Sequence, residues 1–464
     1  MNPTGPFDWM RNNAVADRGC CIQHLADRNI SRRSIAYYGV ISTLLTILGC
    51  RETSIQPVVN ESVPANHAAS SWPALFGPNR NCVAYETNLT SEWDADGPEI
   101  AWEKEVGIGY SSPVIDQDRA IIFHREADEE VIECVDAADG ETLWRFQYPT
   151  SYECQYGYSD GPYSTPVVFQ DRVIAIGAEG LVHAVSLSDG SKIWGRDLHK
   201  DYQVEEGLFA AGATPLLVEG RLIICLGGLE KEAGIVALDV ETGGTLWTAT
   251  DHRASYAMPC FSRIHGQDYV FALTFEGLVA LNPETGEIYW EYAIRPKAPD
   301  SVNATSPQTV DDLVLVVTGP GPGSVCLRIL EDGTYEEVWR DRRVLDSQFN
   351  SLLLYDGCVF GFTAKRQGGS QFRCVDLQSG KLRWKFSSKL ERGSVLGADG
   401  FLFLLGENGH LASMKLDREK ATLISMSDPI LRSPCYSAIA LYKRHLYVRN
   451  EHRLLCLDIE RKSK

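Results

Sequence analysis

The histidines are the residues of this chain with the most potential for catalysis or metal binding, and their spacing assembles no known reaction centre. The chain has ten histidines, and His124, His183 and His252 are typical in standing far from one another. No pair has the HxxxH or HExxH spacing of a zinc site. No glycine-rich phosphate loop is present either, because the GPGPG stretch at 319–323 contains two prolines that lack amide donors. We therefore expect no catalytic residue and no metal site. The sequence favours a protein that is not an enzyme.

The elements that would position any functional residue come from an internal repeat. Residues 237–247 read ALDVETGGTLW, and similar stretches occupy 134–144, 184–194, 280–290 and 374–384. Each has a small residue, an Asp or Asn turn that includes Gly, and a Trp ten positions after the small residue, except that residues 184–194 have Ser186 before the turn. Short polar side chains and Gly favour a hairpin turn, and a constant spacing fixes the strand register.

A second strand pair precedes each of these hairpins. Its first strand follows a proline, and a proline fits the start of a strand because no ladder N–H is needed there. A short polar turn and another apolar run follow, which gives four strands per repeat, the unit of a β-propeller blade. The prolines are Pro113, Pro166, Pro215, Pro259 and Pro307.

The tryptophans that end the repeats indicate how many blades the chain forms. A weak copy without Trp lies near 411–425, and the last strands, near 444–449 and 453–458, lack a fourth partner. The strand around Trp102 has no blade before it, so the two chain ends complete one blade and close the ring. We predict an all-β, eight-bladed propeller of four-stranded antiparallel blades over residues 72–464, with seven blades as the alternative. The counted residues are Trp102, Trp144, Trp194, Trp247, Trp290, Trp339 and Trp384.

The cysteines fit packing better than disulfides. Thirteen are present, ten of them after Cys50. Several take the small-residue position that Ala184, Ala237 and Ala280 take in other copies, where Cys behaves as a small buried hydrophobe. We expect mostly free, buried thiols. The cysteines in this position are Cys134, Cys326, Cys374 and Cys456.

The first fifty residues look like an export signal. Arg32-Arg33 precede an apolar run over 35–48, which is short for a membrane span and suits a signal-peptide core. The following Gly49-Cys50 resembles a lipobox, whose cysteine would carry a lipid anchor. We expect an export signal over 1–50, a flexible tether over 51–71, and a periplasmic propeller anchored to a membrane through Cys50.

The composition limits the classes of partner that the protein could bind. Hydrophobic residues make up 44% of the chain, which is ample for a core, and the net charge is −18. No Lys/Arg cluster appears in the repeats. A nucleic acid partner would require a basic surface, so the charge argues against one, and it also disfavours binding to anionic lipid surfaces.

The best candidate site is the propeller mouth, formed by the residues just before each inner strand. Propellers commonly bind ligands at the mouth of the central channel, and a mixture of aromatic rings, amides and an arginine suits a peptide, a sugar or a small polar ligand. The alternative is that these side chains merely fill the channel. A long Tyr-rich connection over 146–158 could form a rim or lid there, or a separate partner-binding patch. The candidate residues are Tyr110, Tyr163, Tyr256, Asn303, Asn350, Arg392 and Tyr436.

The repeat, matched in full by Ala237 to Trp247, resembles the tryptophan-docking repeat of the quinoprotein-like propeller family. The resemblance covers about residues 72–460, and residues 72–80 (WPALFGPNR) look like the segment that precedes the propeller in exported members. The family includes dehydrogenases that use pyrroloquinoline quinone with calcium. It also includes the non-catalytic propeller lipoprotein of the outer-membrane β-barrel assembly machinery, which this chain is nearest to in character.

The resemblance implies two functions. A quinone dehydrogenase of this family needs a calcium site with Glu, Asn and Asp ligands, and its alcohol-oxidising members place a vicinal disulfide over the quinone. The only adjacent cysteines here are Cys20 and Cys21, ahead of the export signal core, and no calcium loop of EF-hand spacing appears. We therefore expect no cofactor and a non-catalytic scaffold that binds a protein or peptide at the cell envelope. The alternatives are a quinoprotein oxidoreductase acting on alcohols or sugars, and a carbohydrate-binding propeller.

Overall fold

The fold was analysed in a computed structural model, which describes residues 71–205, 209–295, 303–462. The chain divides into two compact units, Met1–Val59 and Asn60–Lys464, and everything below concerns the second. The expected export signal, Cys50 and nearly all of the expected tether lie outside the described residues. No helix in the described part has the length and apolar character needed to cross a membrane.

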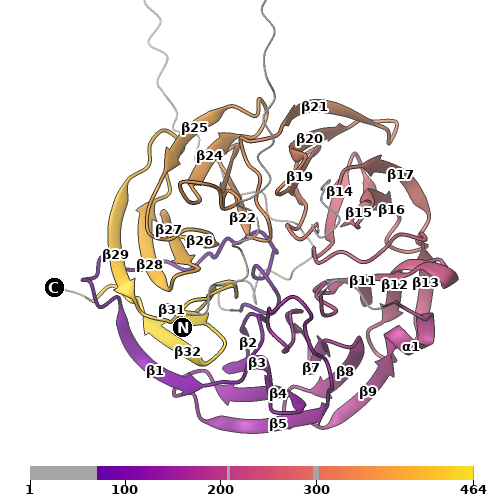
Figure 1. Ribbon diagram of the computed structural model, residues 1–464, viewed down its shortest axis with the longest axis horizontal. Helices are drawn as coiled ribbons and strands as arrows, with labels where there is room; N and C mark the ends of the chain where they lie inside the picture. Colours follow the sequence, from indigo (N-terminus) through magenta and orange to yellow (C-terminus); the bar gives the residue numbers. More distant parts are fainter. Residues whose placement is uncertain (1–70, 206–208, 296–302, 463–464) are drawn as a thin grey trace, which may run out of the picture. The chain divides into compact units, whose positions relative to one another are not determined.

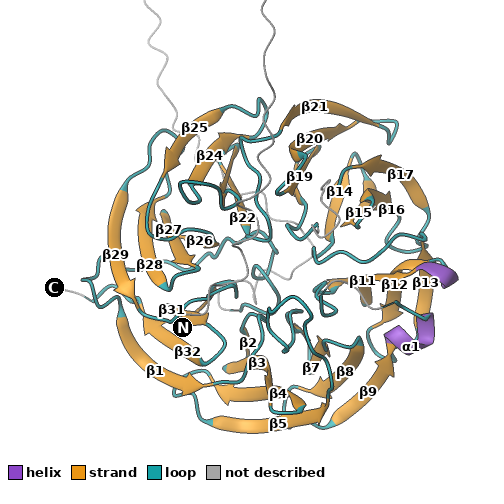
Figure 2. Ribbon diagram, in the orientation of Figure 1, coloured by secondary structure: helices purple, strands orange, loops and turns teal. Residues whose placement is uncertain are grey.

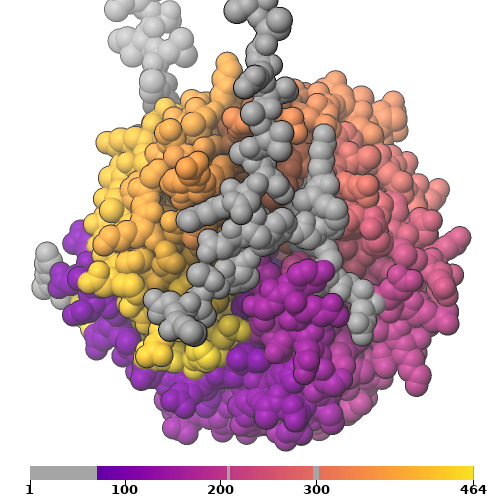
Figure 3. Space-filling model, viewed as in Figure 1, coloured from indigo at the N-terminus to yellow at the C-terminus, as the bar shows by residue number. Residues whose placement is uncertain are grey.

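The described strands form eight four-stranded antiparallel sheets arranged as the blades of a ring (Figures 1 and 2). This confirms the prediction of eight blades over seven. Each sheet runs from an inner strand near the centre to an outer strand at the rim. Figure 3 shows the blades abutting one another in sequence order, with the yellow C-terminal sector next to the indigo N-terminal one.

The first four blades follow one another along the chain. Blade 1 contains β2 (Val114–Asp116), β3 (Arg119–Glu126), β4 (Glu129–Asp136) and β5 (Thr142–Pro149). Blade 2 contains β6 (Val167–Phe169), β7 (Arg172–Ile176), β8 (Leu181–Ser186) and β9 (Lys192–Asp197), followed by the short helix α1 (Leu198–Tyr202). Blade 3 contains β10 (Leu216–Val218), β11 (Arg221–Gly228), β12 (Ala233–Asp239) and β13 (Thr245–Ala249), with a 3-10 turn at Leu229–Lys231. Blade 4 contains β14 (Cys260–Ile264), β15 (Gln267–Leu273), β16 (Gly277–Leu281) and β17 (Ile288–Ala293).

The remaining blades complete the ring. Blade 5 contains β18 (Gln308–Val310), β19 (Leu313–Thr318), β20 (Gly323–Ile329) and β21 (Tyr335–Asp341). Blade 6 contains β22 (Leu352–Tyr355), β23 (Cys358–Phe362), β24 (Phe372–Asp376) and β25 (Leu382–Phe386). Blade 7 contains β26 (Gly393–Ala398), β27 (Phe401–Gly406), β28 (His410–Lys415) and β29 (Leu423–Pro429). Blade 8 contains β30 (Ala440–Tyr442), β31 (His445–Arg449), β32 (Arg453–Asp458) and β1 (Glu99–Glu105).

Because strands alternate in direction, the ring has two distinct ends. The segments that precede the inner strands lie at one end, which we name the mouth face. The hairpin turns between the third and outer strands lie at the other end, which we name the turn face. The five predicted prolines each stand directly before an inner strand, as at Pro113 before β2.

Each repeat tryptophan joins its blade to the next one. The Trp144 indole donates a hydrogen bond from Nε1 to the carbonyl of Leu187 at 2.9 Å, and its ring covers Gly190 in the same turn of blade 2. Gly190 has φ of +73° and leaves no room for a side chain beneath the ring. The small residue of the repeat lies directly opposite the Trp in the ladder, as Cys134 does opposite Trp144. The other six tryptophans donate in the same way to Ala137, Val240, Pro283, Gly333, Leu377 and Asp417.

The seam of the ring is closed as predicted. Strand β1 pairs with β32, and Trp102 lies opposite Cys456. Trp102 then docks on the carbonyl of Ala137 in blade 1 at 3.0 Å. Arg449 is fully buried at this seam and donates to five backbone carbonyls, four of them in the segment from β1 into blade 1. The two chain ends therefore complete one blade, with no free edge left inside the ring.

The weak copy forms a complete blade, although it lacks a tryptophan. Met426 of β29 takes the Trp position opposite Ala412. Trp93, from the segment before β1, stacks near Phe403 of the same blade at 6.3 Å and its amide donates to Ser425 Oγ at 3.1 Å. A side chain distant in sequence thus packs on the blade whose own repeat has lost its tryptophan.

The segment 72–86, here named the N-terminal strap, crosses the middle of the ring. Trp72 exchanges backbone hydrogen bonds with Ile115 of β2, and Pro73 accepts one from Val168 of β6. Further along, Ala84 donates to Gly397 of β26 at 2.9 Å. Because these partners belong to the inner strands of blades 1, 2 and 7, the strap lies across one part of the channel.

The hydrophobic core consists of layers between neighbouring blades. Ile132 of blade 1, for example, belongs to the same cluster as Val173 and Val185 of blade 2. The ten cysteines in the described residues are free thiols, and eight of them are buried, which confirms the expectation of unpaired packing residues.

Candidate functional site

Four of the candidate mouth residues come together in one cluster at the mouth face. The ring of Tyr110 lies 4.9 Å from that of Tyr163 and 5.2 Å from that of Tyr436. Tyr436 in turn contacts Phe349 at 5.0 Å, and the Arg392 guanidinium lies 4.8 Å from the centre of the Phe349 ring. Burial raises the pKa of Tyr110 and raises that of Tyr436 to about 12, so both hydroxyls remain protonated at neutral pH.

Arg392 is held by hydrogen bonds within this cluster. Its Nε donates to Glu407 Oε2 at 2.7 Å and its Nη1 to Gln348 Oε1 at 2.9 Å. Its Nη2 donates to the Tyr436 hydroxyl at 3.2 Å. The second oxygen of Glu407 accepts from Lys365 Nζ at 3.0 Å. Arg392 is 3% exposed, so its charge serves a buried network between blades 6, 7 and 8.

Tyr256 belongs to a second aromatic group. Its ring lies 5.5 Å from that of Phe209, and its hydroxyl accepts a hydrogen bond from the Phe209 amide at 2.9 Å. Phe209 also contacts Tyr156 at 5.5 Å and Tyr158 at 5.2 Å, both from the Tyr-rich connection. Tyr156 is 44% exposed, so this group presents aromatic surface to solvent at the mouth face.

The Tyr-rich connection is tied to the mouth. The Ser159 amide donates to the Tyr110 hydroxyl at 3.1 Å, and the Tyr163 hydroxyl donates to the Ser159 carbonyl at 3.0 Å. Arg125 of β3 donates a hydrogen bond to the carbonyl of Asp160 at 3.1 Å. The connection therefore rests on the first aromatic cluster and contacts the second, as a rim would.

The two asparagines are buried and bonded to neighbouring protein groups. Asn303 is 1% exposed, and its Nδ2 donates to the carbonyls of Thr274 and Ile294 at 2.8 and 3.1 Å. Its Oδ1 accepts from Thr318 Oγ1 at 2.7 Å. Asn350 is 5% exposed and accepts from Ser347 Oγ at 3.4 Å. The structure therefore brings the aromatic candidates and Arg392 into clusters, whereas the asparagines are buried beside them.

Several residues of the clusters were absent from the predicted set. Phe209 and Glu407 come from loops outside the repeat pattern. Only the folded ring brings these loops to the mouth face. A signal for Glu407 does exist, because a carboxylate directly follows the apolar strand run 401–406. Phe349 directly precedes Asn350, and the sequence predicts it at the mouth by the same reasoning about inner strands.

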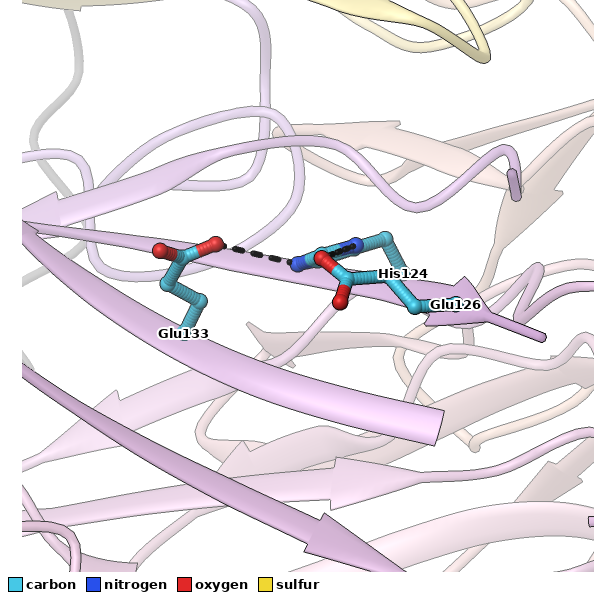
Figure 4. A group of neighbouring side chains, drawn as sticks. All are labelled: His124, Glu126 and Glu133. Carbon is cyan, nitrogen blue, oxygen red and sulfur yellow. Dashed lines mark hydrogen bonds and ion pairs between the residues drawn. The ribbon is translucent and has the colours of Figure 1, made fainter. Parts of the chain in front are cut away.

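One group of side chains could be read as a metal centre: His124, Glu126 and Glu133 (Figure 4). The Gly107 amide donates to His124 Nδ1 at 2.9 Å, and His124 Nε2 lies 3.2 Å from Glu133 Oε2. Both ring nitrogens are thus used, and the two carboxylates lie beside different nitrogens. Since one ion cannot bind through both nitrogens, the arrangement fits a structural histidine better than a metal ligand.

The charge state of this group follows from its contacts. Burial lowers the pKa of His124, so the imidazole is neutral and donates from Nε2. Burial alone would raise the pKa of Glu133, but hydrogen bonds from His124 and Thr142 and the nearby Lys104 hold it at about 2. Glu133 therefore acts as a buried acceptor and stays ionised at neutral pH.

The mouth residues do not fit a calcium-bound quinone. Such a site needs carboxylate and amide oxygens that are free to bind the ion. At this mouth, Glu407 is bonded to Arg392 and Lys365, and the Asn303 oxygen is bonded to Thr318. The carboxylate of Glu407 and the amide oxygen of Asn303 are thus already engaged by protein groups.

The fold and the mouth define this molecule as a tryptophan-docked PQQ-repeat propeller. A family model described as "Outer membrane protein assembly factor BamB" matches residues 61–263, 127–387 and 231–460. The chain belongs to this family.

Curated relatives carry the same description. The protein from Yersinia pestis is 23% identical over 288 residues, which cover 60% of this chain and 68% of that one. The protein from Burkholderia pseudomallei is 27% identical over 250 residues, 49% of this chain and 57% of that one. That from Kangiella koreensis is 32% identical over 125 residues, 27% of this chain and 28% of that one. The chain thus spans from about a quarter to two thirds of their length.

Solved structures share the fold. Quinohemoprotein alcohol dehydrogenase from Comamonas testosteroni superposes with a TM-score of 0.63 and 13% identity, covering 86% of this chain and 82% of that one. BamB from Moraxella catarrhalis superposes with a TM-score of 0.54 and 13% identity, covering 78% and 98%. At this identity the likeness concerns the fold, which enzymes and assembly factors have in common.

Proposed function

We propose that this chain is an exported, non-catalytic scaffold of the cell envelope that binds a protein partner on its mouth face. The observation that carries the proposal is how the side chains at the mouth face are bonded and which of them are exposed. Its charged and amide groups are bonded to one another, while aromatic side chains around Phe209 and Tyr156 remain accessible. Exposed aromatic residues on a firm support are typical of protein interfaces.

The family assignment supports the same function. The curated relatives are named as outer membrane protein assembly factors. We extend this to the present chain as an envelope location, with residues 1–50 as export signal and Cys50 as lipid anchor. A lipid anchor followed by a polar tether would hold the propeller near a membrane without requiring membrane-binding surface of its own.

Site-specific photo-crosslinking tests the proposal. Tyr156 on the mouth face and Tyr355 at the turn-face end of β22 are both tyrosines with 44% exposure, so they form a matched pair. Each is replaced by a photoreactive phenylalanine analogue in the full-length chain, in cells that produce it. We expect Tyr156 to crosslink a defined protein that mass spectrometry identifies, and Tyr355 to crosslink none. Equal labelling at both positions, or none at Tyr156, would contradict a mouth-face partner.

A cofactor assay separates this function from the quinoprotein alternative. The purified chain is mixed with pyrroloquinoline quinone and calcium, and the absorption spectrum and alcohol-dependent dye reduction are recorded. We expect the spectrum to remain that of free quinone, since the oxygens of Glu407 and Asn303 at the mouth are engaged by protein groups. A shifted spectrum with substrate turnover would establish an oxidoreductase instead.

A further inference from the structure

Positive side chains gather at the outer edge of the mouth face, on blades 5 and 6. Arg373 of β24 lies directly opposite Lys385 of β25 in the ladder, so two like charges project from the same face of the sheet. The Arg343 carbonyl accepts a hydrogen bond from Arg373 Nη1, which brings the connection after β21 to the same place. We name Arg342, Arg343, Arg373, Lys385 and Lys389 the basic rim.

Arg373 of the basic rim forms hydrogen bonds only to neutral groups of the described protein. Arg373 donates to the Arg343 and Val344 carbonyls and to Gln371 Oε1, all neutral acceptors. None of the five forms an ion pair with a described carboxylate, whereas the cations around them do. A net charge of −18 makes such a local excess of positive charge unusual.

The carboxylates near the basic rim are already engaged. Asp346 is buried and paired with Arg366, and Glu407 holds Lys365 and Arg392. Asp341 accepts the amides of Arg343 and Val344 at 2.7 Å each. Burial lowers the pKa of Arg373, the carboxylates of Asp346 and Asp341 act against this shift, and the nearby Arg366 acts with it.

The position of the basic rim joins it to the proposed interface. Arg373 stands near the start of β24, Lys385 near the end of β25, and Arg342 just after β21. In this ring all three places are mouth-face ends of strands. The basic rim on blades 5 and 6 and the aromatic group around Phe209 and Tyr156 therefore lie at the same end of the ring, and a partner that spans the mouth face would contact both.

We propose that the basic rim binds an acidic segment of the protein partner, an inference that rests on the proposed function. Arginine forks and lysine match carboxylates in geometry and charge. An extended anionic membrane would meet the whole negative surface of the molecule, whereas a short acidic segment meets the rim alone within a screening length of about 10 Å. Arg373 and Lys385 repel each other in the free protein, and the bound acidic segment relieves this repulsion.

The test uses the full-length chain and fluorescence anisotropy with a labelled oligoglutamate peptide at an ionic strength of about 0.1 M, where the screening length is about 10 Å. Two rim variants are compared, Arg342→Gln with Arg343→Gln, and Lys385→Glu. The matched control combines Lys381→Gln and Lys420→Gln, two exposed lysines in the turn-face hairpins of blades 6 and 7. All three variants lower the net charge by the same amount.

We expect the wild type and the control to bind the peptide, and both rim variants to bind at least about tenfold more weakly, a difference that corresponds to about 1.4 kcal/mol. Lys385→Glu should leave the thermal unfolding midpoint unchanged or raise it, since it replaces a repulsive pair by an attractive one. Weaker binding therefore cannot be attributed to misfolding.

Other outcomes overturn the inference. Equal weakening in the control would mean that only the overall charge matters, and no binding by the wild type would remove the site. Rim-dependent binding to phosphatidylglycerol vesicles but not to the peptide would assign the rim to a membrane instead. If Tyr156 crosslinks a partner and the rim variants change neither crosslinking nor peptide binding, the inference fails while the proposed function stands. If Tyr156 crosslinks nothing, the proposed function itself fails.

Discussion

At the scale of single residues, His183 is exceptional among the buried polar side chains of blades 1 and 2. It is 7% exposed, and neither ring nitrogen has a hydrogen-bond partner. Its imidazole lies 4.3 Å from the ring of Tyr148 and 5.1 Å from that of Phe146. Burial, followed by the charge of Lys192, lowers the pKa of His183 to about 4. The interface between the two blades thus holds a histidine that must stay neutral.

This makes stability depend on pH in a defined direction. An unfolded histidine titrates near pH 6.5, so between that pH and about 4 the unfolded state binds more protons than the folded state, and stability falls as pH falls. Replacing His183 with Phe should remove this part of the pH dependence. We expect the wild type to lose about 1 to 2 kcal/mol more than His183→Phe between pH 7 and pH 4. Urea unfolding at both pH values measures this, and identical losses in the two proteins would show that His183 is not the group responsible.

At the scale of elements, the unit of organisation is the contact between one blade's tryptophan and the next blade's turn. It combines a hydrogen bond to a backbone carbonyl with a ring that lies on a glycine of positive φ. The hydrogen bond recurs at seven of the eight blade boundaries, and the glycine beneath the ring at five of them. Only the boundary after blade 7 lacks it, and there Met426 replaces the tryptophan.

Two glycines of nearly equal backbone geometry isolate the value of this contact. Gly190 has φ of +73° and a Cβ there would lie 2.6 Å from the Trp144 ring, whereas Gly357 has φ of +68° and nothing within 4 Å. Both substitutions to Ala incur the cost of positive φ, but only Gly190→Ala must displace the tryptophan. We expect Gly190→Ala to cost about 1 to 3 kcal/mol more than Gly357→Ala in chemical denaturation. Equal costs would mean that the ring moves away freely and contributes little to the boundary.

At the scale of the whole molecule, closure of the ring depends on pairing between the two ends of the propeller. β1 supplies the outer strand of blade 8, and Arg449 fastens the following segment through carbonyls of Gly107, Gly109 and Ser111. Burial lowers the pKa of Arg449 to about 10, so the guanidinium is still charged at neutral pH. Its charge is balanced by carbonyl dipoles at the seam.

Removing this fastening should weaken the entire ring. Arg449→Gln leaves several buried carbonyls without donors, and we expect a loss of about 2 to 4 kcal/mol in unfolding free energy. Arg461→Gln, an exposed arginine near the C-terminal end of the propeller, serves as control and should change stability by less than about 0.5 kcal/mol. Limited proteolysis should also cut before β2 earlier in Arg449→Gln. An unchanged midpoint in Arg449→Gln would show that strand pairing alone closes the ring.

Much of the fold could be read from local pattern. The ten-residue spacing between Cys134 and Trp144 fixes one hairpin register, because both residues lie on adjacent strands joined by a short turn. The unpaired strand at Trp102 and the missing last strand predicted closure in the same way. The packing of Trp93 on blade 7 could not be predicted, since it depends on where the segment before β1 passes.

The candidate site was only partly accessible to such reasoning. The tyrosines before inner strands were identified by their place in the repeat, and three of them meet at the mouth. Their partners Phe209 and Glu407 belong to loops of variable length, whose course the repeat does not constrain. The asparagines shared the same sequence position as the tyrosines, yet the structure turns Asn303 toward backbone carbonyls.

The sequence by itself therefore determined the blades, their number, their order and the closing of the ring, because each depends on contacts between neighbours in the repeat. Only the tertiary structure decided which groups share the mouth face and where charge accumulates. Arg343, Arg373 and Lys385 are separated along the chain, and they meet because blades 5 and 6 place strand ends side by side. Electrostatic and aromatic contacts depend on distance in space, and a repeat encodes that distance only within and between adjacent hairpins.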